Sequence, residues 1–238
     1  MDIHWTTIQS ITKESDDVFT YALRLPKDFQ TWDEGAHTHF GLKGFNDGER
    51  PNRELVRHMS ISTLPEEGVI GITTRIPTPR SHFKETLRQL NVGDEVAIFK
   101  THSNVPLRRE GRPIYLLASG VGLATFRPLV QQYVADGTDI PFVHSLTIDA
   151  TATPLFSDIF VPSERLEVTV VSERAAYYGA VEQLATDERG LFYVVGSDTF
   201  LRQTIDVLRR AGRTPDQIVI DKHPSMRDDF FNETAQSM

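Results

Sequence analysis

The chain has 238 residues, no cysteine and a formal net charge of −8. This length suits one large domain or two domains of just over a hundred residues each. The absence of cysteine excludes disulfides, a thiol nucleophile and an iron–sulfur cluster on this chain's own thiolates. Redox chemistry would therefore need a bound organic cofactor or a non-thiolate metal. Residues 1–110 carry 14 Lys and Arg against 16 Asp and Glu, and residues 111–238 carry 11 against 17. Neither half is basic, which argues against a nucleic-acid partner.

No segment of the sequence has the character of a targeting signal or a membrane span. The stretch Met1–Trp5 lacks a basic region followed by an apolar run. The longest uncharged stretch, between Arg112 and Arg127, is fourteen residues long, short of the ~20 that a spanning helix needs. We therefore expect a cytoplasmic protein without a membrane span.

The first half predicts a small antiparallel β-barrel. Short stretches of β-branched or alternating residues are separated by polar connectors that carry Gly or Pro, which is typical of strands. One helix is expected at Ser81–Leu90, where Phe83 and Leu87 recur at helical spacing. Six short strands and one helix favour a barrel. The expected strands are Ile3–Ile11, Val18–Leu25, His37–Leu42, Leu55–Ser62, Val69–Arg75 and Glu95–Phe99.

The second half alternates strands and helices, which predicts a parallel sheet with helices on both faces. A charged connector at Pro106–Arg112 separates the halves, so the domains are expected at 1–108 and 109–238. The tail after His223 shows no clear period. The expected strands are Pro113–Ala118, Pro141–Ile148, Leu166–Val171, Leu191–Val195 and Gln217–Asp221. The expected helices are Leu123–Ala135, Leu155–Phe160, Ala180–Thr186 and Thr199–Ala211.

Glycines at two strand ends indicate a ligand site in the second half. Gly120-Val121-Gly122 lies between a strand and a helix, where glycines let a ligand approach the backbone and the helix start attracts an anion. The third glycine of the dinucleotide fingerprint is missing, so a tight turn of any α/β domain explains this segment equally well. Gly196-Ser197 marks a second strand end. Open parallel sheets bind ligands outside the carboxyl ends of their strands, so these two glycine-bearing strand ends favour a ligand crevice.

The first half carries a polar strand that suits an anion. Alternation places Arg57 and Met59 on one face and His58 and Ser60 on the other. An arginine beside clustered hydroxyls suits a phosphate or the edge of a heteroaromatic ring. Downstream, Ser81 precedes a helix and either marks an anion-binding helix start or simply caps the helix.

Histidines also alternate in the first half. His37 and His39 share one strand face and could contact one metal ion. A zinc site needs three or four ligands, and the sequence offers no further cluster beside these two. We therefore expect no metal.

The order of these segments resembles the ferredoxin–NADP reductase superfamily of flavin-dependent oxidoreductases. The resemblance covers about 220 residues and implies a flavin-binding barrel, a nucleotide-binding α/β domain, FAD as cofactor and NAD(P)H as electron donor. The matching segments are Arg57–Thr63 for RxYSxxS/T, Ser81 to Val96 for GxxSxxL…GDxV, Ala118–Phe126 for AGGxGxTPF, Leu155–Asp158 for LFxDE and Tyr193–Ser197 for YVCGP.

The resemblance also implies roles for single residues. Arg57 would pair with the flavin phosphates, and Ser60 would hydrogen-bond near flavin N5. Asp221 could help to relay a proton, and His223 could cover the flavin ring, a place that Phe230 or Phe231 could take instead. The cofactor-binding residues that it implies are Arg57, His58, Met59, Ser60, Thr63, Ser81, His82, Phe83, Gly120, Val121, Gly122, Gly196 and Ser197.

Three further residues bear on the choice between NADP and NAD. Ser172, Arg174 and Arg202 fall where NADP-using members carry groups for the 2′-phosphate. Arginine suits that dianion, whereas the intervening Glu173 would prefer a ribose hydroxyl. We expect NADP, with NAD possible.

The chain departs from the family pattern at several positions. Met59 replaces the aromatic residue beside the flavin, Val195 replaces a cysteine beside the nicotinamide, and the segment from Lys100 to Ser103 has neither glycine of GPxG. We expect an oxidoreductase that moves hydride from NAD(P)H to FAD and then electrons to ferredoxin, flavodoxin, an oxygenase component or a ferric chelate. The alternatives are a flavin- or nucleotide-binding regulatory module with little turnover, and a plain binding protein without a cofactor.

Overall fold

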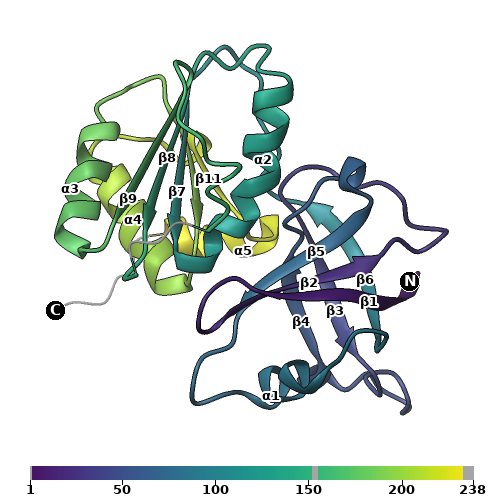
Figure 1. The fold of residues 1–238 in the computed structure, drawn as a ribbon. Helices are drawn as coiled ribbons and strands as arrows, with labels where there is room; N and C mark the ends of the chain where they lie inside the picture. Colours follow the sequence, from purple (N-terminus) through teal and green to yellow (C-terminus); the bar gives the residue numbers. More distant parts are fainter. Residues whose placement is uncertain (1, 152–154, 233–238) are drawn as a thin grey trace, which may run out of the picture. The chain divides into compact units, whose positions relative to one another are not determined.

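The computed structural model describes residues 2–151 and 155–232. The chain divides into two compact units, one ending at Pro106 and the other beginning at Leu107. Figure 1 shows strands and one helix in the first unit, and a sheet flanked by helices in the second.

The first unit is a six-stranded antiparallel barrel, as the sequence predicts. Its strands follow the order β4-β3-β6-β1-β2-β5. An antiparallel bridge between Ile61 and Ile72 brings the two end strands together and closes the barrel. The strands are β1 (Ile3–Lys13), β2 (Val18–Arg24), β3 (Ala36–Leu42), β4 (Val56–Ser60), β5 (Val69–Arg75) and β6 (Glu95–Ser103).

One helix covers an end of the barrel core. Helix α1 (His82–Gln89) buries Phe83 and Leu87 among the inward side chains of the strands, which alternate with outward ones. The Tyr21 hydroxyl donates a hydrogen bond of 3.1 Å to the Leu87 carbonyl and ties the helix to β2. Two 3-10 turns, η1 (Arg53–Leu55) and η2 (Pro65–Glu67), flank β4. Leu55, expected as the first residue of that strand, belongs to η1 instead.

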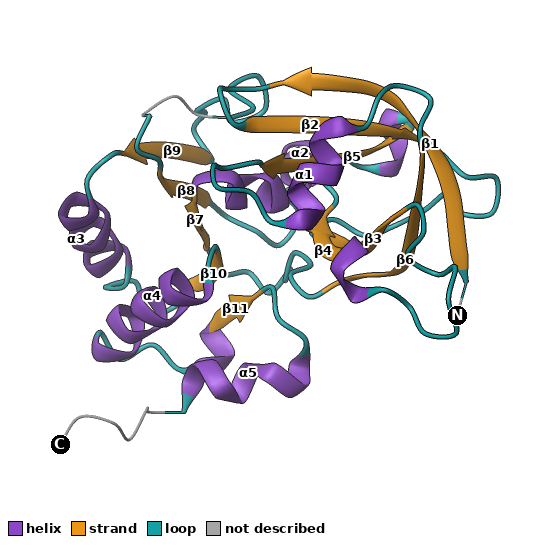
Figure 2. Cartoon of the chain, turned by 90° about the horizontal axis from the view of Figure 1, so that it is seen from below, coloured by secondary structure: helices purple, strands orange, loops and turns teal. Residues whose placement is uncertain are grey.

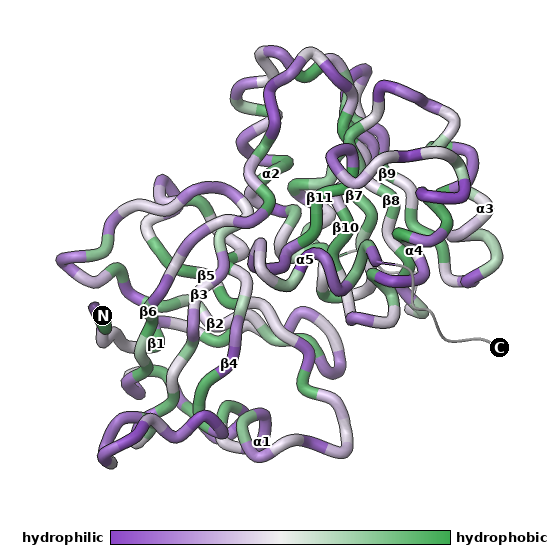
Figure 3. The backbone as a smooth tube through the Cα atoms, turned by 180° about the vertical axis from the view of Figure 1, so that it is seen from behind, coloured by the Kyte–Doolittle hydropathy of each residue, from purple (hydrophilic) through white to green (hydrophobic). Residues whose placement is uncertain are grey.

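The second unit is a parallel sheet in the order β11-β10-β7-β8-β9, again as predicted. Its strands read as hydrophobic runs because both faces are covered (Figure 3). The strands are β7 (Ile114–Ser119), β8 (Val143–Ile148), β9 (Leu166–Val171), β10 (Leu191–Val195) and β11 (Ile218–Ile220).

Helices flank both faces of this sheet. Helices α3, α4 and α5 share one hydrophobic cluster with Phe192 and Val194, and α2 lies on the other face (Figure 2). No helix of the described residues is long and apolar enough to cross a membrane. The helices are α2 (Leu123–Ala135), α3 (Arg174–Leu184), α4 (Asp198–Arg210) and α5 (Pro224–Phe231), with 3-10 turns η3 (Gly120–Gly122) and η4 (Pro215–Gln217).

Three elements differ from the sequence prediction. The helix expected at Leu155–Phe160 is wrong: the segment forms turns, because Phe156 has a φ of 57°, which interrupts a right-handed helix. Helix α3 begins at Arg174 rather than Ala180. The tail expected to be irregular contains α5, which starts at Pro224 with His223 as its N-cap.

Candidate functional site

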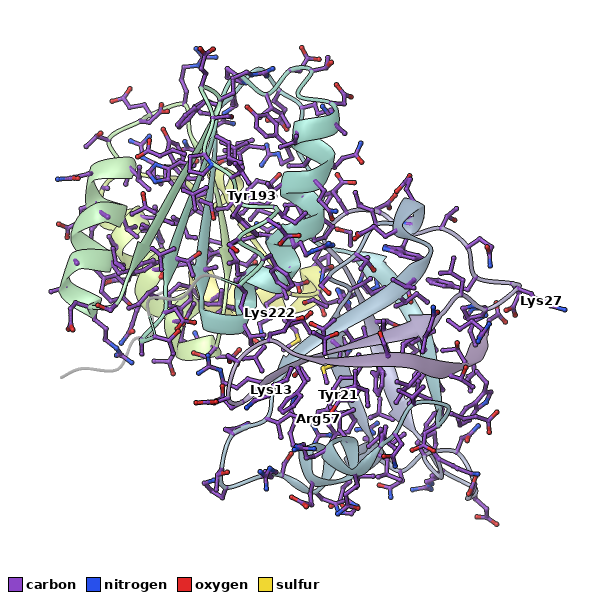
Figure 4. All side chains as sticks on the ribbon, viewed as in Figure 1. Lys13, Tyr21, Lys27, Arg57, Tyr193 and Lys222 are labelled. Carbon is purple, nitrogen blue, oxygen red and sulfur yellow. The ribbon has the colours of Figure 1, made fainter. Side chains whose placement is uncertain are left out.

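In the first unit, Arg57 lies against the first turn of α1 (Figure 4). Its guanidinium carbon is 5.1 Å from the centre of the buried Phe83 ring, a cation–π contact. The Nη1 atom donates to the carbonyl oxygens of Val56 at 2.7 Å and Arg53 at 3.1 Å. The half-buried guanidinium is therefore held in place and keeps other donors for a ligand.

A second cation, Lys84, lies beside Arg57 in the first turn of α1. Its ammonium group donates to the Thr74 hydroxyl. The pKa of Lys84 is lowered to about 8, mainly by burial and in second place by the positive charge of Arg57. Two cations that repel each other at a helix start form a suitable place for a phosphate dianion. Sequence reasoning missed Lys84, although its place three residues after Ser81 put it in the first turn.

Ser81 and His82 begin the same helix. The Ser81 hydroxyl oxygen accepts a hydrogen bond of 3.4 Å from the Lys84 backbone N–H, so Ser81 is the N-cap. His82 is exposed as the first helical residue. The structure thus gathers Arg57, Ser81, His82 and Phe83, all of which the sequence singles out, around the start of α1.

Most of the other residues of the segment Arg57–Thr63 make contacts within the barrel. Met59 is 8% exposed and belongs to the core cluster. The Thr63 hydroxyl donates to the Val69 carbonyl at 2.9 Å and accepts from the Gly71 N–H at 2.8 Å, so it ties its segment to β5. Ser60 ends β4, half-buried. His58 is exposed and points away from the core.

In the second unit, the turn η3 joins β7 to α2 as the sequence predicts. Gly120 has a φ of 52°, which favours glycine. A Cβ atom on Gly122 would lie 2.8 Å from the main-chain oxygen of Val195, so this turn and the end of β10 are in close contact. Ser197 caps α4: its hydroxyl accepts from the Phe200 N–H at 3.3 Å. Both glycine-bearing strand ends therefore lie together at the carboxyl edge of the sheet.

A pocket of about 90 Å³ lies beside these strand ends. It brings Arg174 and Ser197, both predicted, together with Tyr178 and Gln203, which sequence reasoning missed. The Tyr178 hydroxyl donates to Gln203 Oε1 at 2.9 Å. The sequence predicts that helix α3 starts at Ala180, so Tyr178 was not placed on a helix and was not considered as a lining residue. The lining residues are Ser119, Ile148, Arg174, Tyr177, Tyr178, Ser197, Thr199, Phe200 and Gln203.

Two other residues expected at the 2′-phosphate lie outside this lining. The guanidinium carbon of Arg202 is 4.6 Å from the centre of the Phe230 ring, and its Nη1 donates to the Asp229 carbonyl. Arg202 is thus engaged with α5. Ser172 follows β9 and is exposed. Among the three expected groups, Arg174 is the one that lines the pocket.

The residues that follow β11 are held by α5. His223 is exposed, and its Nδ1 accepts from the Ser225 N–H at 3.3 Å as the helix N-cap. Asp221 is half-buried at the strand end. Phe230 is 6% exposed and lies in the core of the second unit, which corrects the expectation that it is available to cover a flavin. Phe231 is half-buried, with the Arg227 guanidinium carbon 5.5 Å from its ring centre.

The described residues contain no group of three or more His, Cys, Asp or Glu side chains arranged to hold a metal ion. The candidate residues of each unit are cations, helix starts or glycine turns, which are groups that bind phosphates.

Comparison with known proteins identifies the fold. No protein-family model and no curated protein matches the sequence. Among solved structures, the CS and b5R domains of human Ncb5or in the NAD+ form superpose with a TM-score of 0.74 at 16% identity, covering 93% of this chain and 70% of that one. The ferredoxin-NADP+ reductase of Plasmodium falciparum gives 0.73 at 10% identity, covering 93% and 96%. The cytochrome b5 reductase domain of Ulva prolifera nitrate reductase gives 0.72 at 16% identity, covering 92% and 97%. The chain therefore has the two-unit fold of the ferredoxin–NADP reductase superfamily.

Proposed function

We propose that the chain is an oxidoreductase that binds FAD, takes hydride from NAD(P)H and passes electrons to a separate acceptor. The observation that carries this proposal is the convergence of Arg57 and Lys84 on the first turn of α1. Two neighbouring cations repel each other, and an anion between them offsets that repulsion. A dinucleotide phosphate would supply this negative charge. Two of the solved proteins with this fold are a ferredoxin-NADP+ reductase and the cytochrome b5 reductase domain of a nitrate reductase.

At the flavin end, we assign the phosphates to Arg57, Lys84 and the backbone N–H groups of residues 81–83. Ser60 would donate to the ring near N5, with His58, Met59 and Thr63 shaping the strand that passes it. The flavin supplies the redox chemistry when bound, and these residues supply position and charge. We assign the flavin-binding domain to residues 1–108 and the nucleotide-binding domain to residues 109–238.

At the nicotinamide end, we assign the pyrophosphate to the turn formed by Gly120, Val121 and Gly122 and to the cap formed by Gly196 and Ser197. Both turns need glycine, since Gly120 has a φ of 52° and a Cβ atom on Gly122 or on Gly196 would lie 2.8 Å from the Val195 oxygen or 2.5 Å from the Phe200 ring. Each turn also leads into a helix, whose first N–H groups attract a phosphate, and this supports the assignment.

The pocket next to these turns would take the adenosine end of the nucleotide. Arg174 lines it and would pair with a 2′-phosphate, so we favour NADPH over NADH. Ser172 and Arg202 would support that phosphate only if they turned toward it, and the engagement of Arg202 with α5 makes Arg174 the main determinant.

Asp221 and His223 are proposed to hold and move a proton at the end of β11. Both are polar groups at a strand end, and the His223 ring is oriented by its hydrogen bond to the Ser225 N–H. Ferredoxin, flavodoxin, an oxygenase component and a ferric chelate are the candidate acceptors.

Absorption spectroscopy and stopped-flow kinetics test the proposal. Protein purified with excess FAD and freed of unbound cofactor should show a flavin spectrum. Anaerobic mixing with NADPH should bleach that spectrum faster than mixing with NADH. A flavin that neither nucleotide bleaches would support a regulatory module instead. The burial of Met59 in the core favours this alternative, because Met59 replaces the aromatic residue beside the flavin. A protein that binds no flavin would contradict both.

A further inference from the structure

Four histidines meet on the face of β3, β4 and β6 that is turned away from the barrel core. The strand register places His39 opposite His58 and His37 opposite His102. The ring centres are 4.0 Å apart in the first pair and 4.2 Å apart in the second, and those of His37 and His58 are 5.1 Å apart. We call these four residues the histidine group.

Two members of the group, His39 and His58, are hydrogen-bonded to each other. Their Nε2 atoms are 2.8 Å apart. One Nε2 must donate the hydrogen and the other must accept it, so at least one of the two rings is neutral while this bond exists. A second proton would turn two N–H groups toward each other with no acceptor between them. The contact between β3 and β4 at this point therefore depends on the pair carrying no more than one positive charge.

The described surroundings of the pair add positive charge rather than negative. An open cavity of about 400 Å³ borders both rings, and none of the residues that line it is acidic. The pKa of His39 is lowered to about 4, first by burial and then by the neighbouring histidines and Lys100. The charged and titratable groups that line the cavity or act on His39 are His37 on β3, Arg57 and His58 on β4, Lys100 and His102 on β6, and Arg53 on η1.

The strand that this pair holds, β4, is an end strand of five residues. It pairs with β3 along one edge, and the bridge to β5 on its other side lies at Ile61, after the strand has ended. Met59 anchors the inner face of β4 in the core, and His58 makes the contact with β3 on the outer face. A short strand paired on one edge opens locally at a lower cost than strands in the middle of a sheet.

We propose that the His39–His58 pair is a pH-sensitive latch, which holds β4 on β3 at neutral pH and releases it in acid. Protonation of both rings replaces a hydrogen bond by a repulsion on the outer face, so that β4 opens more often while the rest of the barrel stays folded. Because β4 also carries Arg57, opening loosens the place assigned to the flavin phosphates. This last consequence rests on the proposed function, whereas the latch itself does not.

Amide hydrogen exchange of the apoprotein at pH 7.5 and 5, followed by mass spectrometry, tests the latch without flavin. After correction for the intrinsic pH dependence of exchange, the protection of residues 56–60 should fall about fivefold at pH 5, which corresponds to the loss of one hydrogen bond. Strand β2 pairs with both β1 and β5, so it is the internal reference and should keep its protection. Equal protection of β4 at both pH values would refute the latch, because the His58 ring would then turn into solvent without any effect on the strand.

Variants assign the effect to the pair. His39→Gln and His58→Gln should each abolish the fall in protection, because glutamine does not titrate and can still hydrogen-bond to the remaining histidine. His82→Gln, at an exposed position on α1, is the matched control and should keep the wild-type fall. Circular dichroism checks that each variant is folded. A fall that persists in the folded variants of the pair would overturn the proposal.

The rate of FAD release, followed by flavin fluorescence, tests the consequence for the cofactor. It should rise about fivefold from pH 7.5 to 5 in the wild type and stay constant in His39→Gln. Lys84 does not contribute in this range, because its pKa of about 8 keeps it charged. A protein that binds no FAD would contradict the proposed function and leave the exchange result unaffected. A rate of FAD release that does not change with pH, in a protein whose β4 opens in acid, would refute the link between the latch and the flavin.

Discussion

Gly122 packs against the main-chain oxygen of Val195 so closely that a Cβ atom on the glycine would lie 2.8 Å from that oxygen. Gly122 ends η3, between β7 and α2, and Val195 ends β10. The neighbouring atom is backbone in a central strand, so it cannot rotate away as a side chain would. The contact therefore couples the shape of the proposed pyrophosphate turn to the position of β10.

Gly122→Ala should lower the stability of the second unit by about 1–3 kcal/mol, the usual cost of forcing an extra methyl into a packed site. It should also weaken NADPH binding, because η3 must shift away from β10. Urea unfolding followed by circular dichroism measures the first effect, and nucleotide titration measures the second. Gly179→Ala is the control: nothing lies within 4 Å of a Cβ at that position in α3, so it should be neutral or stabilise by up to about 1 kcal/mol. Equal unfolding midpoints for Gly122→Ala and the wild type would show that the turn yields without cost.

Arg57→Gln should weaken FAD binding at least tenfold, since loss of a charged hydrogen-bond partner costs about 1.5–3 kcal/mol. Fluorescence titration of the apoprotein with FAD measures the change. The matched control is Arg88→Gln, because Arg88, near the end of α1, makes a similar cation–π contact, 5.0 Å from the Phe19 ring centre on β2. An Arg57→Gln protein that keeps wild-type FAD affinity would mean that the phosphates bind elsewhere.

Lys84 should make FAD binding depend on pH. Its pKa is lowered to about 8, mainly by burial, so the free protein loses this charge as the pH rises through 8. A bound phosphate favours the charged form and raises the pKa again, so FAD binding takes up a proton above pH 8. The dissociation constant should rise between pH 7 and 9.5. Lys84→Arg should flatten that rise, because arginine stays charged throughout. The same slope in both proteins would remove Lys84 from the phosphate site.

The barrel and the parallel sheet follow from local sequence patterns, because alternating and continuous apolar runs specify which strand faces are buried. The elements that the sequence did not predict depend on tertiary contacts. Helix α5 carries one fully packed aromatic residue, Phe230, among polar neighbours, so its periodicity is weak. Its contact with Arg202 then decides where that arginine lies, which no property of α4 alone reveals.

The grouping of His37, His39, His58 and His102 likewise could not be predicted from the sequence alone. The alternation of His37 and His39 is visible in one strand. The addition of His58 and His102 requires the register of β3 with β4 and with β6, which hydrogen bonds between distant segments determine. The position of Lys84 was visible in the sequence, whereas its nearness to Arg57 depends on the docking of α1 against the barrel.

Arg174 and Arg202 should have separable effects. Arg174→Gln should reduce the preference for NADPH over NADH about tenfold, because it removes the cation that lines the adenosine pocket. Arg202→Gln should leave that preference unchanged and lower stability, because it removes the contact with Phe230. Steady-state kinetics with both nucleotides and thermal unfolding distinguish the two. A loss of NADPH preference in Arg202→Gln would show that this side chain leaves α5 when nucleotide binds.

His39 should make the stability of the first unit depend on pH in the acidic range. Its pKa is lowered from the ordinary 6.5 to about 4, first by burial and then by the nearby His58, Lys100, His37 and His102. The unfolded chain therefore binds more protons than the folded one between those values, so stability falls as the pH drops from 6.5 towards 4. We expect a contribution of about 1 kcal/mol, because the ring is partly exposed and solvent screens the charges.

Urea unfolding of the apoprotein at pH 7.5, 6 and 5 measures that contribution. Acid also weakens carboxylate ion pairs, so the informative quantity is the difference between proteins rather than the slope of one. His39→Gln should lose less stability than the wild type between pH 7.5 and 5, because glutamine does not titrate and can still hydrogen-bond to His58. His82→Gln, at an exposed position on α1, should follow the wild-type slope. If His39→Gln and the wild type lose stability in parallel, the strain of a charged histidine group does not contribute to acid unfolding of this barrel.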